Sequence, residues 1–251
     1  MNIIAPLAAL LAPLAALLAP LAALLAPLAA LLAFAAVPAT AATASRNFGV
    51  NGFDEVRVIG PYSVSVTTGV APFARASGSA AGIDKVAMRV EGKTLIIGED
   101  HSNSSGQSAG PVTIAVGTHE LSRASVNGVG SIAIDRARGL SFGLSVAGAG
   151  QGTIANIDVD QFRLTMDGSG SVKLSGRAPM LTAVIRGAGT VEASGLSVKD
   201  LTVTAEGPAV VAVTATGTAK VTAGGTSTVT LSGSPSCTLK TVGSATVSGC
   251  R

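Results

Sequence analysis

The sequence predicts an all-β protein whose C-terminal half is a solenoid, a coil made of stacked turns of β-strand. A short motif, aliphatic-x-Gly-small-Gly-polar-aliphatic, recurs along this half and first appears at residues 126–132. The recurrence has a period of about 20 residues, which is typical of repeats that are too small to bury a core alone. The chain also has 31 glycines and only 3% aromatic residues, a composition that suits a narrow interior between stacked strands.

The first glycine of each motif marks the predicted bend between two strands. Such a bend needs glycine where a Cβ atom would clash or where φ must be positive. In later repeats alanine or serine replaces the second glycine of the motif, so we expect only the first glycine to be strictly required. The bend glycines predicted in this way are Gly128, Gly148, Gly168, Gly187, Gly207, Gly225 and Gly243.

Aliphatic residues form columns when the repeats are aligned on the bend glycine. They lie two and four positions before it, as at Val126 and Ala124, and four positions after it, as at Ile132. In the last repeat the two positions before the glycine are Leu239 and Thr241. Alternate residues of a strand face the same side, so we expect these columns to face the interior.

Charged residues on the outer side are predicted to form ladders that set the register of the turns. The residue before the bend glycine is Asp167, Arg186 and Glu206 in three successive repeats, which would stack charges of alternating sign. Lys173 and Glu192 would pair in the same way one column over. Opposite charges on neighbouring strands contribute about 0.2–1 kcal/mol each, so we interpret these pairs as structural rather than as a binding site.

Serine and threonine residues form another outer column. If the repeats stack in register, these hydroxyl groups lie one above another along the coil. Two interpretations stay open: the hydroxyls hydrogen-bond with one another and are structural, or they bind a ligand. The members of this column are Ser131, Ser171, Thr190, Thr228 and Thr246.

The N-terminal segment, residues 1–44, differs from the rest of the chain. It contains four identical copies of a seven-residue apolar repeat and ends in small residues at the spacing that a signal peptidase recognises. We interpret it as a signal peptide that is cleaved between Ala44 and Ser45. A segment this long and apolar also fits an uncleaved membrane anchor, which is the alternative. Either interpretation predicts that the remainder is exported.

The exported part is predicted to be one domain, residues 45–251. Residues 45–121 show the alternation of β-strands without the strict repeat, and residues 122–251 form the solenoid. Two apolar runs flank residues 91–94, which we expect to connect a β-hairpin. No helical periodicity of useful length appears after residue 45.

Two cysteines, Cys237 and Cys250, lie near the end of the last repeat. They lack the CxxC spacing and the nearby histidine of a redox or metal pair. We interpret them as a disulfide that keeps the open end of the solenoid from fraying, which agrees with an oxidising compartment. Two free thiols are the alternative.

Charge and motif content argue against several function classes. The formal net charge is only +3, and no run of lysine and arginine interleaves with aromatic residues, so we expect no nucleic-acid partner. The histidines, His101 and His119, lack a third ligand at metal spacing. We therefore expect no metal site and no cofactor.

One group of side chains could in principle support catalysis on polysaccharides. Such enzymes need clustered carboxylates, which hold calcium or act as acid and base. A solvated polar face is the commoner outcome for such a group, so we assign no catalytic residue and expect a non-enzyme. The members of this group are Asp158, Asp160, Arg163 and Asp167.

The recurring V-x-G-x-G-x-(I/V) steps resemble the head-GIN domain, a bacterial family described as autotransporter adhesin heads. Upstream segments at residues 53–58, 61–66 and 92–97, and the start of the repeats at 121–130, resemble it too. The resemblance covers about residues 47–249. It implies an exported β-solenoid similar to right-handed β-helices, and it supplies no catalytic residues.

These observations together predict an exported binding protein of the periplasm, the cell surface or the medium. We expect an adhesin-like, non-catalytic module whose partner is a polysaccharide or another cell-surface ligand. Membrane contact would involve only the N-terminal segment, and the strand edges at the solenoid ends would allow self-association. The alternatives are a polysaccharide-active β-helix enzyme and a passive envelope scaffold.

Overall fold

The structure, a computed structural model, describes residues 44–100 and 110–251. The predictions for the first 43 residues and for His101 lie outside the described residues. Thr43–Arg251 form one compact unit, whose described residues are mainly β-strands with one short helix. In the described part of the chain, no helix is long and apolar enough to cross a membrane.

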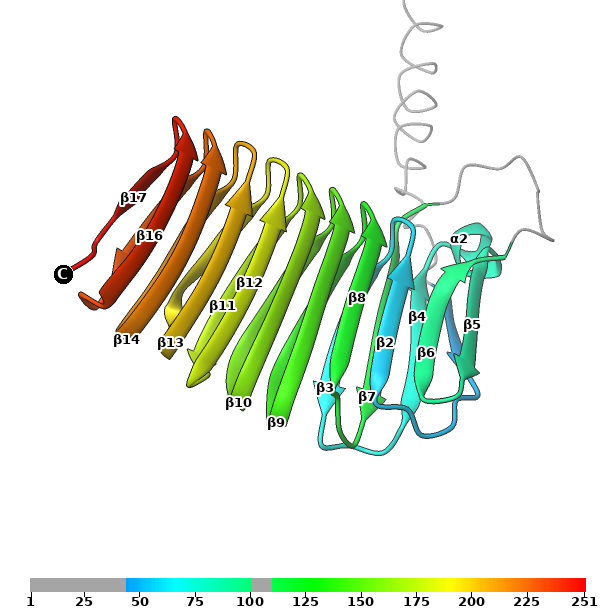
Figure 1. Ribbon diagram of the computed structural model, residues 1–251. Coiled ribbons are helices and arrows are strands. Elements are labelled where there is room, and N and C mark those ends of the chain that lie inside the picture. The colour runs from blue at the N-terminus through cyan, green and yellow to red at the C-terminus, as the bar shows by residue number, and fades with distance from the viewer. Residues whose placement is uncertain (1–43, 101–109) are drawn as a thin grey trace, which may run out of the picture. The chain divides into compact units, whose positions relative to one another are not determined.

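The strands form two faces of a coil, because each turn contributes one segment to each face (Figure 1). The first face contains β3 (Ser63–Thr68), β7 (Val112–Thr118), β11 (Ser171–Arg177), β15 (Thr228–Ser232), β17 (Thr246–Ser248) and the first halves of β9 (Ser131–Gly148), β10 (Gln151–Gly168), β13 (Thr190–Glu206) and β14 (Val210–Gly225). The second face contains β2 (Glu55–Ile59), β6 (Thr94–Glu99), β8 (Arg123–Gly128), β12 (Met180–Arg186), β16 (Ser236–Gly243) and the second halves of the same four long strands.

Consecutive turns pair in parallel and in register, which confirms the predicted β-solenoid. Gly168 pairs with Gly148, and Gly148 pairs with Gly128. All seven predicted bend glycines have a positive φ, between 71° and 124°. At Gly168 (φ +124°) a Cβ atom would also lie only 2.4 Å from the carbonyl oxygen of Gly148, so both reasons for glycine apply there. The second glycine is also tight in the early turns, since a Cβ atom on Gly170 would lie 2.5 Å from the Gly150 oxygen.

The N-terminal end of the coil has a spatial order that differs from the order along the chain. β2 and β3 pair in parallel with β8 and β9 and form the turn next to the regular solenoid. β6 and β7 pair in parallel with the other sides of β2 and β3. Antiparallel strands then end each face. On one face, β5 (Val86–Glu91) lies beside β6. On the other face, β4 (Phe73–Gly78) lies beside β7, and β1 (Ala44–Phe48) lies beside β4. The less regular N-terminal part is thus continuous with the solenoid.

Two local features complete this part. β5 and β6 form the predicted hairpin, in which Glu91 pairs with Thr94. The structure adds one short helix, α2 (Ala80–Asp84), which periodicity did not predict because five residues are too few to show a helical period. Its first turn is capped by the Ser79 hydroxyl, which accepts a hydrogen bond from the Gly82 N–H at 3.1 Å.

The core lies between the two faces and consists of the predicted aliphatic columns. Ala124, Val126 and Ile132 are at most 1% exposed. Phe142 and Phe162, which pair in register on β9 and β10, stack in this interior with ring centroids 5.8 Å apart. Small aliphatic residues fill the rest, so the narrow space excludes water without many aromatic rings.

The last turn departs from the predicted burial. Leu239 is 45% exposed and Thr241 is also exposed, whereas the matching residues of the preceding turn, Val221 and Ala223, are buried. Among the described strands, β16 pairs only with β14 and β17 only with β15. None of the described strands covers this end, so the prediction that Leu239 and Thr241 would be enclosed is wrong.

Candidate functional site

The predicted hydroxyl column lies on the first face, and we keep that name for it. Successive register pairs join its members, with Gln151 and Val210 taking the two intervening places: Ser131–Gln151–Ser171–Thr190–Val210–Thr228–Thr246. Each member is exposed or half-buried. Within the described residues, none of the five hydroxyl groups makes a hydrogen bond to another protein group. The hydroxyls are therefore aligned but not bonded to each other.

The column next to it has the same character. Thr153, Thr230 and Ser248 are exposed there, and the remaining places are taken by small residues and by one ion pair, Lys173–Glu192. The Lys173 Nζ and the Glu192 Oε2 are 3.7 Å apart. Together the two columns give the first face an outer surface of short side chains that carry hydroxyls.

The second face carries the predicted charge ladder. Asp167, Arg186 and Glu206 are register partners on β10, β12 and β13. The Arg186 guanidinium lies 3.7 Å from a carboxylate oxygen of each neighbour. All three side chains are at least half exposed, so water screens these pairs and each contributes little to stability.

The side chains considered for catalysis do not form one cluster, because two of them pair with different arginines. The Asp158 carboxylate binds Arg177, with 3.0 Å between Oδ1 and the guanidinium nitrogen. Asp167 belongs to the charge ladder. Asp160 and Arg163 are exposed, and no ion pair joins either of them to another described residue. No cluster of three potential metal ligands occurs within the described residues, and the carboxylates do not converge on one point.

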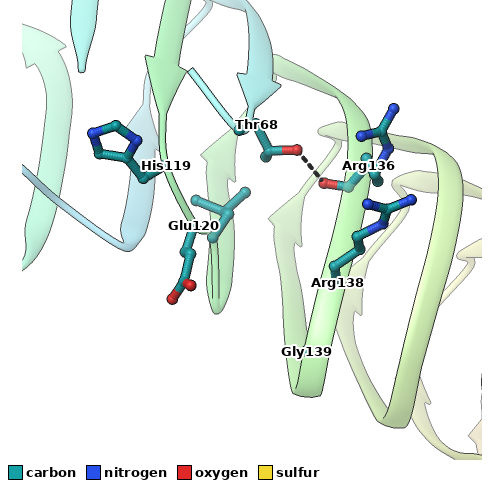
Figure 2. Close-up of a pocket in the computed structure, with 8 residues that line it drawn as sticks. Thr68, His119, Glu120, Arg136, Arg138 and Gly139 are labelled. Carbon is teal, nitrogen blue, oxygen red and sulfur yellow. Dashed lines mark hydrogen bonds between the residues drawn. The ribbon is translucent and has the colours of Figure 1, made fainter. Parts of the chain in front are cut away.

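A cavity lies where the less regular N-terminal part meets the regular coil, and we call it the seam pocket (Figure 2). Its volume is about 320 Å³. β3 ends at one side of it, the connection between β7 and β8 forms another side, and the first corner of β9 forms the third. The polar and glycine residues that line it are Thr68, Gly69, His119, Glu120, Arg136, Arg138 and Gly139.

The pocket exists because β3 stops pairing with β9 before the corner. Their ladder ends at Val66 and Ile134. Beyond it, the side chain of Asp135 replaces the ladder: its Oδ1 accepts hydrogen bonds from the Thr68 N–H at 3.0 Å and the Thr68 hydroxyl at 3.2 Å. The corners of β10 and β13 have a regular turn on each side, but the corner of β9 has no regular turn before it.

The sequence interpretation missed this pocket. Of its residues only His119 had been considered, and it lies on the wall without a metal cluster around it. Thr68 and Arg136 are far apart in the chain, so no spacing rule connects them. The one local signal is that this corner carries two cations, Arg136 and Arg138. The matching positions of the next turn are Asn156 and Asp158.

At the C-terminal end, Cys237 and Cys250 are joined by a disulfide with their Cα atoms 5.7 Å apart. It links β16 to the residues that follow β17 in the uncovered last turn. At the opposite end, Ala44 and Ser45 are the first two residues of β1, the edge strand that pairs with β4.

Among the described residues, Tyr62 has a shifted pKa. Burial raises the pKa of Tyr62 above its ordinary value of 10.0, and the nearby Glu99 carboxylate raises it further. The Tyr62 hydroxyl lies 3.4 Å from the Lys85 carbonyl oxygen, to which it donates a hydrogen bond. This hydrogen bond links the turn between β2 and β3 to Lys85.

Solved structures share this fold at low sequence identity. A putative adhesin from Bacteroides fragilis is similar with a TM-score of 0.70 and 20% identity, over 82% of this chain and 95% of that one. A putative lipid binding protein from Parabacteroides distasonis gives a TM-score of 0.63 and 18% identity over 82% and 95%. A putative adhesin from the same organism gives 0.62 and 18% over 83% and 97%. No curated protein matches the sequence.

A family model matches residues 52–235, which is most of the chain. The match begins just before β2 and runs through the turns of the solenoid to β15, so it spans both the less regular part and the repeats. The similarity to the solved structures, at 20% identity or less, establishes only the fold. The match of the sequence to the family model establishes the family. The chain belongs to the family described as "Putative auto-transporter adhesin, head GIN domain".

Proposed function

We propose that this protein is an exported, non-catalytic binding protein of the cell envelope whose first face binds an extended polysaccharide. One observation carries the proposal: the hydroxyl column is exposed or half-buried, in register, and without hydrogen-bond partners among the described residues. Of the two interpretations that the sequence left open, a self-bonded structural ladder does not fit this geometry. A ligand surface does.

The chemistry of the face suits a polysaccharide. A hydroxyl group both donates and accepts hydrogen bonds, as the hydroxyls of a sugar do. Strands of a sheet repeat every ~4.8 Å, so the column offers a hydroxyl group at multiples of this spacing, interrupted at Gln151 and Val210. Individually weak contacts repeated along one chain add up through effective concentration. A long flat face can therefore bind a repetitive ligand without a deep cleft.

Export is the second part of the proposal. It is supported by the apolar segment 1–44 with its candidate cleavage site before Ser45, and by a cysteine pair that would persist only in an oxidising compartment. The family description concerns adhesins, which act at cell surfaces. We place the protein in the periplasm, on the cell surface or in the medium.

The proposal assigns no polysaccharide-cleaving activity to the carboxylates considered for it. Acid and base roles need carboxylates that converge on one bond. Here Asp158 is occupied by Arg177 and Asp167 by Arg186, which leaves Asp160 exposed and alone within the described residues.

The test uses the full-length chain, purified in the form that the producing cell yields, on a panel of immobilised envelope and extracellular polysaccharides. Retention and the release of new reducing or unsaturated ends are recorded in the same tubes. We expect retention without cleavage. A Ser171→Ala, Thr190→Ala, Thr228→Ala variant should be retained less, because three hydroxyls of the column are lost.

The matched control lies on the second face. Thr182→Ala with Thr202→Ala removes two exposed hydroxyls there and should leave retention unchanged. Equal loss in both variants would contradict a role specific to the first face. Cleavage that Asp160→Ala abolishes would establish an enzyme instead.

A further inference from the structure

We propose that the seam pocket binds the carboxylate of an acidic sugar residue, a uronic acid, so that the protein selects acidic over neutral polysaccharides. The inference rests on the proposed function, because it names the charge class of the same kind of ligand. Four properties of the pocket carry it: two arginines without carboxylate partners, its net charge, its size and polar groups, and its position.

The first property is the pair of arginines at the corner of β9. Neither Arg136 nor Arg138 forms an ion pair with any described residue. Asp158 is the register neighbour of Arg138, but its carboxylate binds Arg177 on the other side. In Figure 2 the side chains of Arg136 and Arg138 both extend from the corner of β9. Guanidinium groups bind carboxylates through two parallel hydrogen bonds, so an unoccupied pair favours such a ligand.

The second property is the charge of the pocket walls. The ionisable lining residues are Arg136, Arg138, Glu120 and His119. The two arginines and the one glutamate together give a net charge of +1. A singly charged carboxylate neutralises this pocket, whereas a doubly charged phosphate would leave an excess negative charge beside Glu120. The walls therefore favour a carboxylate over a phosphate.

The third property is the room and the polar groups available around the charge. About 320 Å³ is at the lower end of the range of ligand pockets, which suits one sugar ring better than a larger group. The buried side chain of Leu121 contributes an apolar surface, and the Glu120 carboxylate can accept hydrogen bonds from ring hydroxyls. A sugar that carries a carboxylate would use both the cationic and the neutral parts of the wall.

The position connects the pocket to the first face. β3 and the first half of β9 belong to that face, and both reach the pocket at their ends. Thr68, which closes β3, is fixed to Asp135 by two hydrogen bonds, so this wall of the pocket is held in place before any ligand arrives. Preorganised walls reduce the entropic cost of binding.

The experiment measures binding by calorimetry with three probes: an oligogalacturonate, the uncharged oligogalactose and inorganic phosphate. The protein is the full-length chain in the form that the cell yields. We expect the oligogalacturonate to bind more tightly than the oligogalactose, and phosphate to bind least. The double variant Arg136→Gln, Arg138→Gln should weaken oligogalacturonate binding about tenfold or more and reduce it to the level of the neutral probe.

Two further variants make the result specific. Arg163→Gln removes an exposed arginine that has no ion pair among the described residues and does not line the pocket, so it should leave binding unchanged. Arg138→Lys keeps the charge and loses the planar pair of donors, so it should weaken binding less than Arg138→Gln does. Circular dichroism of each variant checks that the fold is retained.

The outcomes separate this inference from the proposed function. If neutral polysaccharides are retained but the oligogalacturonate gains nothing over oligogalactose, the pocket inference is wrong and the binding function stands. The same holds if phosphate binds best, or if Arg163→Gln weakens binding as much as the double variant does. If no polysaccharide is retained at all, both proposals fail.

Discussion

The Oδ1 atom of Asp135 accepts hydrogen bonds from both the backbone N–H and the hydroxyl of Thr68, at 3.0 and 3.2 Å. This contact takes over where the β3–β9 ladder ends, and it fixes the irregular N-terminal part against the first turn of the solenoid. The Thr68 hydroxyl also lies 3.1 Å from the Arg136 carbonyl oxygen, so Thr68 contacts two successive residues of β9.

Replacement of Asp135 by alanine should lower the free energy of unfolding by about 1 kcal/mol, because the Thr68 N–H loses its side-chain acceptor at a half-buried position. Chemical denaturation measures this change. Asp135→Asn keeps a carbonyl oxygen in place of Oδ1 and should retain most of the stability. Asp160→Ala, at an exposed position without an ion pair, is the control and should change stability by less than about 0.5 kcal/mol.

Gly168→Ala should be strongly destabilising. The backbone there has φ +124°, which costs about 1–3 kcal/mol for other residues, and the new Cβ atom would lie 2.4 Å from the Gly148 oxygen. The thermal unfolding midpoint should fall well below that of Gly52→Ala, whose Cβ atom would meet nothing within 4 Å. Equal midpoints would show that the bend can accept a side chain.

The regular half of the fold could be predicted because its information is local and repeated. A glycine every 20 residues or so, with aliphatic residues at fixed offsets, determines both the bends and the inward columns, and Gly128, Gly148 and Gly168 pair as the alignment implied. The charge ladder followed from the same alignment, since register in one column determines the register of all others.

The N-terminal half could not be predicted in this way because its contacts are non-local. Glu55 on β2 pairs with Arg123 on β8, although β3, β4, β5, β6 and β7 lie between them in the chain, and no repeat connects the two positions. The seam pocket is formed by these non-local contacts, so the sequence could not predict it either. The exposure of Leu239 has a different cause: the repeat pattern marks inward positions, but it does not say that the final turn lacks a neighbour.

Reversal of charge at the centre of the ladder tests whether it sets the register. Arg186→Glu would place a third carboxylate between Asp167 and Glu206, and like charges on neighbouring strands repel. We expect a lower melting temperature, corresponding to about 1 kcal/mol or less at these exposed positions, and a smaller effect at high salt. Arg163→Glu, on the same strand as Asp167 but without an ion pair, is the control. An unchanged melting temperature for Arg186→Glu would remove the register hypothesis.

The disulfide should protect the last turn rather than the whole coil. Cys237→Ser with Cys250→Ser frees the residues after β15, where most side chains are already exposed. Amide hydrogen exchange should therefore accelerate in β16 and β17 and stay unchanged in β10. Mass spectrometry after thiol alkylation checks the bond itself: two alkylated cysteines in the untreated protein would show that it does not form.

The burial of Tyr62 predicts that its hydroxyl titrates at a higher pH in the folded protein than in the unfolded protein. It is the single tyrosine of the chain, so the ultraviolet absorbance of tyrosinate reports this residue alone. The folded protein should titrate above pH 10, because burial and the Glu99 carboxylate both raise the pKa of Tyr62, and the unfolded protein should titrate near 10.0.

The raised pKa of Tyr62 determines how the free energy of unfolding changes with pH. A group whose pKa is raised on folding stabilises the folded state fully below its unfolded pKa, and this contribution is lost as the pH rises through the folded value. The free energy of unfolding should therefore fall above about pH 10. Tyr62→Phe should weaken that fall, since phenylalanine cannot ionise. A folded-state midpoint at or below 10.0 would contradict the burial of this hydroxyl in the turn between β2 and β3.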